Sequence, residues 1–182
     1  MYLISAYFDE NTNKILKHLQ QRIADKTGND FMIRNNVMPH LTISAIEARN
    51  VDVLIPAFEK VCRGKLQPLD EKGVANNTIN IVSVGQLFPR VIYAAPVLNE
   101  YMMNLSISIY NEFATIPETN ISKFYQPYSW MPHITLGKCL DKEQMRQAFA
   151  VLQDLFMPID GLIAKIGLST VNPYREVMSV AL

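Results

Sequence analysis

Nearly the same six residues occur twice in this chain, once in each half. Residues 38–43 read MPHLTI and residues 131–136 read MPHITL, so two of the three histidines occupy the same place in a repeated motif. The pattern around each motif also repeats, because each half is expected to run strand, helix, motif strand, helix, strand and strand. This repeat predicts an internal duplication within one fold rather than a short-period solenoid.

Hydrophobic periodicity and turn signals predict an α+β fold in a single domain covering residues 1–182, with halves of about 1–85 and 86–182. Strands outnumber what a doubly wound parallel sheet needs, and short turns join consecutive strands, as at Asn76-Asn77 and residues 85–89. Both features favour antiparallel sheets with helices on one side. The expected helices cover residues 12–26, 51–62, 98–113 and 141–156, and the expected strands cover residues 2–8, 38–46, 66–75, 78–84, 90–97, 131–136, 159–168 and 176–182.

Alternate side chains of a strand point to opposite faces, so each motif separates into a polar pair and an apolar pair. His40 and Thr42 share one face, and His133 and Thr135 share the corresponding face of the second motif. If a pseudo-two-fold axis relates the halves, two imidazoles and two hydroxyls can converge on one small ligand. The repeated motif therefore predicts a shared site built from both halves.

Two imidazoles and two hydroxyls suit the chemistry of a phosphodiester. A neutral imidazole can accept a proton from a nucleophile while an imidazolium gives one to the leaving oxygen, and the reference pKa of about 6.5 leaves both forms populated near neutral pH. Threonine hydroxyls can donate to the non-bridging phosphate oxygens. We therefore expect His40 and His133 to be catalytic, Thr42 and Thr135 to bind phosphate, and the reaction to need no metal or other cofactor.

Two other interpretations of the histidines stay open at this point. They could be structural residues of core strands, because threonine is common in strands whatever its function. They could instead bind zinc, but no carboxylate or third histidine is placed by spacing to complete such a site.

The paired H-x-T motif resembles the 2H phosphoesterase superfamily, and more closely its branch of bacterial 2′-5′ RNA ligases and 2′,3′-cyclic phosphodiesterases. The resemblance is carried by residues 39–43 (PHLTI) and 132–136 (PHITL). Residues 85–88 (GQLF), before the expected strand 90–97, are similar to the mid-chain hairpin of the family. The resemblance implies a bilobed, pseudo-two-fold duplicated fold, in which two antiparallel sheets line a central cleft and helices pack on the outside.

The resemblance also implies an enzyme, a metal-independent phosphodiesterase that opens 2′,3′-cyclic phosphates of nucleotides or RNA ends to 2′-phosphates. By analogy with related cyclic phosphodiesterases, His133 would activate water and His40 would protonate the departing ribose oxygen. One alternative is a 2′-5′ RNA ligase or 2′-5′ oligonucleotide phosphodiesterase. Another is a non-catalytic module that binds an RNA end or nucleotide in the same cleft.

Four tyrosines are candidate substrate-binding residues. Tyr125 and Tyr128 lie in an aromatic segment, residues 124–130, just ahead of the second motif, and could stack on a nucleobase. Alternatively, this segment anchors a long loop against the body of the protein. Tyr7 and Tyr93 fall on the expected first strands of the two halves and could face the cleft.

Composition and charge narrow the range of partners and locations. Seventeen basic and seventeen acidic side chains balance, which argues against a protein that grips long duplex nucleic acid through many phosphates. No segment reaches the roughly 20 apolar residues needed to span a bilayer, and no signal peptide is expected. The two cysteines form no disulfide framework. We therefore expect a soluble, cytoplasmic monomer whose partner is a cyclic nucleotide or an RNA end.

Overall fold

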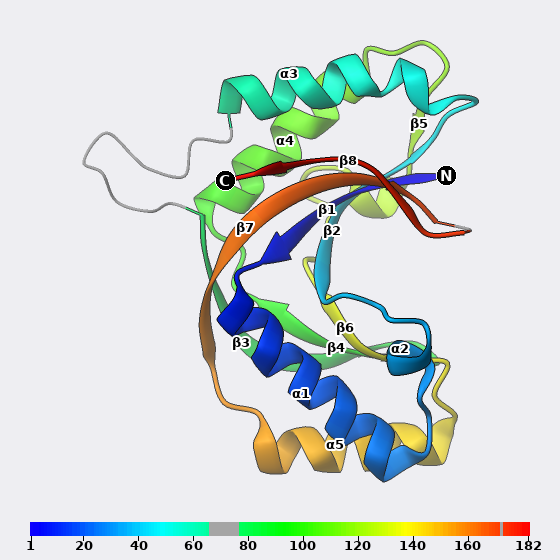
Figure 1. Cartoon of the computed structure of the whole chain (residues 1–182), viewed down its shortest axis with the longest axis vertical. Helices are drawn as coiled ribbons and strands as arrows, with labels where there is room; N and C mark the ends of the chain where they lie inside the picture. Colours follow the sequence, from blue (N-terminus) through cyan, green and yellow to red (C-terminus); the bar gives the residue numbers. More distant parts are fainter. Residues whose placement is uncertain (66–76, 172) are drawn as a thin grey trace.

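The computed structural model describes residues 1–65, 77–171 and 173–182 and gives a mixed α+β fold (Figure 1). The helices are α1 (Glu10–Thr27), α2 (Phe31–Arg34), α3 (Ile55–Lys65), α4 (Glu100–Phe113) and α5 (Lys142–Leu155), with short 3-10 turns η1 (Val51–Val53) and η2 (Lys123–Tyr125). The strands are β1 (Tyr2–Phe8), β2 (His40–Glu47), β3 (Thr78–Leu87), β4 (Val91–Pro96), β5 (Asn120–Ile121), β6 (Ile134–Lys138), β7 (Ile159–Thr170) and β8 (Arg175–Ala181).

All described strand pairings are antiparallel, as the short turns between strands predict. They link the strands into one eight-stranded sheet in the order β1-β2-β6-β4-β3-β7-β8, with β5 on β2 and a further pairing between β1 and β7. The expected α+β class with antiparallel strands is therefore confirmed.

The sheet is organised as two lobes that share strand β7. One lobe contains β2, β1, β8 and residues 163–170 of β7, and the other contains β6, β4, β3 and residues 159–162 of β7. A second connection is the pairing of Leu41 on β2 with Ile134 on β6. The motif strands of the two halves thus meet directly within one hydrogen-bonded sheet.

Each half of the sequence contributes a strand to the lobe built around the other half. In the first half, β3 pairs with β4 of the second half, and in the second half, β7 pairs with β1 of the first half. The expected boundary near residue 85 lies inside β3, where Gly85 is paired with Tyr93. Each lobe is consequently built from residues of both halves.

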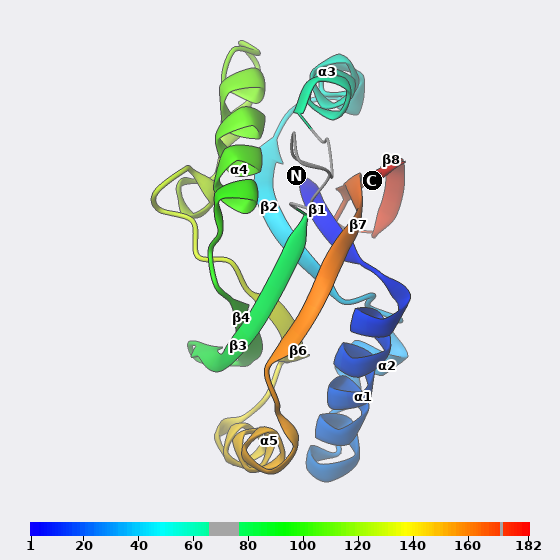
Figure 2. The same cartoon turned by 90° about the vertical axis from the view of Figure 1, so that its left-hand side faces the viewer.

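The helices lie outside the strands, in one group at each end of the molecule (Figures 1 and 2). Helices α1 and α5 pack together at the end that holds β4 and β6, and α3 and α4 pack together at the end that holds β1 and β2. Between helices and strands lies a core of aliphatic and aromatic side chains, whose largest fully buried members include Phe58, Phe113, Ile4, Leu16 and Ile23.

Local signals in the sequence account for the helix boundaries. The Asp9 side chain caps α1 by accepting hydrogen bonds from the backbone N–H groups of Asn11 and Thr12, and Gly28 ends the helix at φ 68°. Asp141 and Gln144 form a reciprocal capping box at the start of α5. These caps satisfy backbone groups that the first and last helical turns leave unpaired.

Several details differ from the expectations or lie beyond them, among them helix α2 in the segment ahead of the first motif. The expected helix 51–62 starts with the 3-10 turn η1, because the Asn50 side chain accepts from the Asp52 N–H and caps that turn first. Strand β5 and turn η2 interrupt the expected loop before the second motif. The expected strand 66–75 lies outside the described residues.

Candidate active site

The repeated motifs lie side by side at the junction of the lobes. His40 opens β2, and His133 directly precedes β6 at Ile134, which is paired with Leu41. Leu41 and Ile134 are fully buried, whereas both histidines are partly exposed. The pairing therefore brings the histidines of the two halves into one region of the fold.

Both imidazoles are held by the same type of hydrogen bond. His40 Nδ1 lies 2.7 Å from the Met38 carbonyl oxygen, and His133 Nδ1 lies 2.9 Å from the Met131 carbonyl oxygen. A carbonyl oxygen can only accept, so each Nδ1 must carry the hydrogen and donate it. In the neutral ring, Nε2 is then the unprotonated nitrogen and is left to accept or donate a proton.

The surroundings of His40 favour its neutral form. Burial lowers the pKa of His40 below its ordinary value of 6.5, and the positive charges of His133 and Lys138 lower it further, against the raising effect of the hydrogen bond to Met38. The electrostatic effect of His133 means that the two rings interact, since one imidazolium disfavours the other. The His40 ring is therefore suited to accept a proton.

The backbone of each motif threonine is fixed by a side chain from another element. Trp130 donates its indole N–H to the Thr42 carbonyl oxygen at 3.0 Å, and Gln20 of α1 donates to the Thr135 carbonyl oxygen at 3.1 Å. Thr42 is buried and Thr135 is partly exposed. The Trp130 contact agrees with the interpretation that the aromatic segment 124–130 serves partly as an anchor.

Two of the four candidate tyrosines lie against the histidines. The ring centroids of Tyr7 and His40 are 6.1 Å apart, and those of Tyr93 and His133 are 5.7 Å apart. Tyr7 is opposite His40 in the pairing of β1 with β2. Each half therefore supplies one tyrosine beside its own motif histidine.

Each of these tyrosine rings lies over a glycine of an exchanged strand. A Cβ atom at Gly85 of β3 would lie 2.5 Å from Tyr93 Cζ, and one at Gly167 of β7 would lie 3.0 Å from Tyr7 Cε2. Contacts this short cannot be accommodated without movement, so the absent side chains make room for the rings. The strand exchange thus contributes directly to the site.

The other two candidate tyrosines are placed differently. Tyr128 is 84% exposed and lines a surface pocket with Tyr110 and Ile107 of α4. Tyr125 packs against the hydrophobic core, where burial raises the pKa of its hydroxyl. The structure therefore groups Tyr7 and Tyr93 with the histidines and places Tyr128 beside α4.

A further set of polar residues extends from Tyr7 across β7 and β8. The Tyr7 and Tyr174 hydroxyls are 2.9 Å apart, and Lys165 Nζ lies 4.8 Å from the centroid of the Tyr7 ring. Lys165 also forms a 2.7 Å ion pair with Glu176. No sequence motif marks these three neighbours of Tyr7, because they come near it only through the pairing of β7 with β1 and of β8 with β7.

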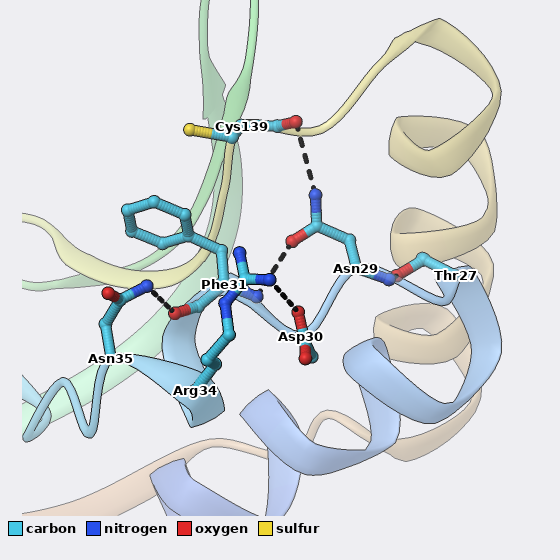
Figure 3. Close-up of polar contacts among 7 residues, drawn as sticks. All are labelled: Thr27, Asn29, Asp30, Phe31, Arg34, Asn35 and Cys139. Atoms are coloured by element: carbon cyan, nitrogen blue, oxygen red, sulfur yellow. Dashed lines mark hydrogen bonds and ion pairs between the residues drawn. The ribbon is translucent and has the colours of Figure 1, made fainter.

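A hydrogen bond links the loop before the first motif to Cys139, which directly follows β6 (Figure 3). The Asn29 side chain donates to the Cys139 carbonyl oxygen at 3.2 Å and accepts from the Phe31 N–H. Lys138, the last residue of β6, holds its ammonium 5.8 Å from the centroid of the Phe31 ring. This link places a lysine close enough to influence His40.

Within the described part of the chain, no group of three or more histidine, cysteine, aspartate or glutamate side chains is arranged to hold a metal ion. Both cysteines are free thiols. No helix among the described residues is long and apolar enough to cross a membrane.

Comparisons with known proteins find similarity at the level of structure and not at the level of sequence. No family model matches the chain, and no curated protein matches it. Among solved structures, the chain is similar to the one titled "Structure of Kluyveromyces marxianus Usb1", with a TM-score of 0.45 and 9% sequence identity. That similarity covers 100% of this chain and 97% of the other.

Proposed function

We propose that this protein is a metal-independent phosphodiesterase of the 2H type, which opens 2′,3′-cyclic phosphates of nucleotides or RNA ends to 2′-phosphates. The observation that carries the proposal is the matched pair of histidines on adjoining motif strands. Each Nδ1 is fixed by a carbonyl oxygen two residues upstream, so each ring offers Nε2 for proton transfer.

The reaction needs one proton acceptor and one proton donor. A general base takes a proton from water as the water oxygen attacks phosphorus, and the bond from phosphorus to the ribose 3′ oxygen breaks. A general acid gives a proton to that departing oxygen, which leaves a 3′ hydroxyl and a 2′-phosphate. One neutral and one protonated imidazole supply both functions without a further cofactor.

We assign His40 as the base and His133 as the acid, the reverse of the roles implied by the family resemblance. The lowered pKa of His40 keeps its ring neutral near pH 7, which a base requires. The hydroxyls of Thr42 and Thr135 would donate to the non-bridging oxygens, whose negative charge grows in the transition state.

The first experiment compares turnover of a 2′,3′-cyclic nucleotide by the wild type and by His40→Ala and His133→Ala. Loss of a general acid or base should lower kcat by about 10²- to 10⁴-fold. His18→Ala is the matched control, because His18 is an exposed histidine on α1. Unchanged turnover in either motif variant would overturn the proposal.

A second substrate separates the roles of the two histidines. An aryl phosphodiester releases a phenolate that leaves without protonation, so it needs a base but no acid. His133→Ala should regain most of its activity on such a substrate, while His40→Ala should not. The opposite result would exchange the two roles without affecting the proposed reaction.

Parallel assays with 2′-5′ linked oligonucleotides distinguish the alternative functions. Faster cleavage or ligation of these substrates than of cyclic nucleotides would favour the 2′-5′ ligase or phosphodiesterase. A nucleotide that binds and is recovered intact after long incubation would favour a binding module.

A further inference from the structure

Tyr174, directly before β8, places an exposed aromatic ring beside Tyr7, the neighbour of His40. Tyr174 is 60% exposed, yet its hydroxyl is fixed 2.9 Å from the Tyr7 hydroxyl. Tyr7 is 6% exposed, and its ring lies against the His40 ring. A buried tyrosine thus connects the exposed Tyr174 ring to the proposed base.

The Tyr7 hydroxyl is suited to hold Tyr174 in place. Burial raises the pKa of Tyr7 well above its ordinary value, and the adjacent Tyr174 hydroxyl raises it further. Tyr7 therefore keeps its proton across the working pH range and remains able to donate a hydrogen bond. Because Tyr7 sits over Gly167 between paired strands, it has little freedom to move away.

The charges beside Tyr7 favour an uncharged ligand group over a further phosphate. Lys165, which lies over the Tyr7 ring, is neutralised by its ion pair with Glu176. Glu176 also accepts a hydrogen bond from Ser179 at 2.8 Å. A phosphate placed here would meet a carboxylate as well as an ammonium, whereas a nucleobase would meet an aromatic face flanked by polar groups.

The flank of the site beside His133 is built differently. Tyr93 lies over Gly85, and its hydroxyl contacts the Met131 sulfur at 3.9 Å. These groups present a half-buried ring and a thioether, and among the described residues no ion pair like that beside Tyr7 contacts them. The two flanks are therefore chemically distinct although the motifs are alike, which gives an asymmetric ligand a preferred orientation.

We infer that Tyr174 is the platform on which the base of the cyclic nucleotide stacks, with Tyr7 as the residue that positions it. The inference rests on the proposed function and adds the orientation of the substrate, with its nucleoside over Tyr174. Stacking on an aromatic side chain is tolerant of base identity, so all four bases should be accepted.

The test compares two substrates that differ only in the base. One is a 2′,3′-cyclic nucleotide and the other is the 2′,3′-cyclic phosphate of methyl ribofuranoside, which has no base. In Tyr174→Leu, kcat/KM for the nucleotide should fall about 5- to 100-fold, mainly through KM, while kcat/KM for the baseless substrate stays within about twofold. Tyr174→Phe keeps the ring but removes the hydrogen bond to Tyr7, so its preference for the nucleotide should lie between those of wild type and Tyr174→Leu.

Phe88→Leu is the matched control, because Phe88 is an 87% exposed aromatic in the turn between β3 and β4. It should leave both substrates unaffected. Equal losses on both substrates in Tyr174→Leu would indicate a structural effect and overturn the inference, as would no loss on either. The deciding quantity is therefore the ratio of kcat/KM for the nucleotide to kcat/KM for the baseless substrate, and not the overall rate.

Failure of the inference can be separated from failure of the proposed function. Active wild type with an unchanged Tyr174→Leu variant would refute only the stacking platform. If the wild type turned over neither substrate, calorimetric titration with a nucleoside 2′-monophosphate would still decide the matter. Equal affinity of wild type and Tyr174→Leu would then refute the platform, and weaker binding by the variant would support it.

Discussion

Replacing Gly85 with alanine places a methyl group in space that the Tyr93 ring occupies. The added carbon would lie 2.5 Å from Tyr93 Cζ and 3.1 Å from Cε2, whereas carbon atoms in contact are normally about 3.5 Å or more apart. The ring must therefore move by about 1 Å. Because Tyr93 is only half-buried, we expect a stability cost near the lower end of the usual 1–3 kcal/mol for overpacking.

The effect of Gly85→Ala on catalysis should exceed its effect on stability. The Tyr93 ring lies against His133, so its displacement shifts or frees the imidazole. A displacement of about 1 Å in a reacting group can cost on the order of 10²-fold in rate. We expect turnover of a 2′,3′-cyclic nucleotide to fall about 10- to 100-fold, while denaturant unfolding shows a loss of about 1 kcal/mol.

A double-mutant cycle identifies Tyr93 as the mediator of this effect. Once Tyr93→Ala has removed the ring, adding Gly85→Ala should change the rate little. Gly161→Ala is the control, because its methyl group would clash with Thr12 at the start of α1 and so lower stability. If Gly85→Ala slowed the reaction equally with and without the Tyr93 ring, the reasoning would be refuted.

Two further predictions concern stability. The lowered pKa of His40 means that the folded state resists protonation of a ring that the unfolded chain protonates near pH 6.5. The unfolding free energy should therefore fall as pH drops below about 6.5, and His40→Gln should show a shallower fall; equal slopes in denaturant titrations would contradict this. Asp9→Ala removes the acceptor for the N–H groups of Asn11, Thr12 and Leu162 and should cost about 1–2 kcal/mol, while Asp9→Asn should cost less. Equal thermal denaturation midpoints for wild type and Asp9→Ala would count against that role.

The parts of the fold set by local chemistry could be predicted from the sequence. Asp9 and Gly28 bound the first helix because capping and left-handed backbone depend on residues close in the chain. The two-residue alternation of the motif strands predicts that Leu41 and Ile134 are buried, as observed, but Thr42 on the opposite face of β2 is buried as well. The meeting of His40 with His133 could be predicted only because the motif occurs twice.

What depends on long-range pairing could not be predicted in this way. Nothing in the period of β7 indicates that it joins β1 at one end and β3 at the other. Tyr174 gives no signal of its own, since it approaches Tyr7 only through that pairing. The position of Tyr128 beside α4 could not be predicted either, because its proximity in sequence to the second motif says nothing about α4, and its role in substrate binding stays a prediction.

The reciprocal exchange of β3 and β7 makes the two halves depend on each other for folding. A chain corresponding to one half alone would leave β1 or β4 with an unpaired edge, which another copy could fill by donating its own strand. The same pairings made between separate copies would form a strand-swapped dimer. Joining the halves in one polypeptide turns that association into an intramolecular event, so the two histidines meet at any protein concentration.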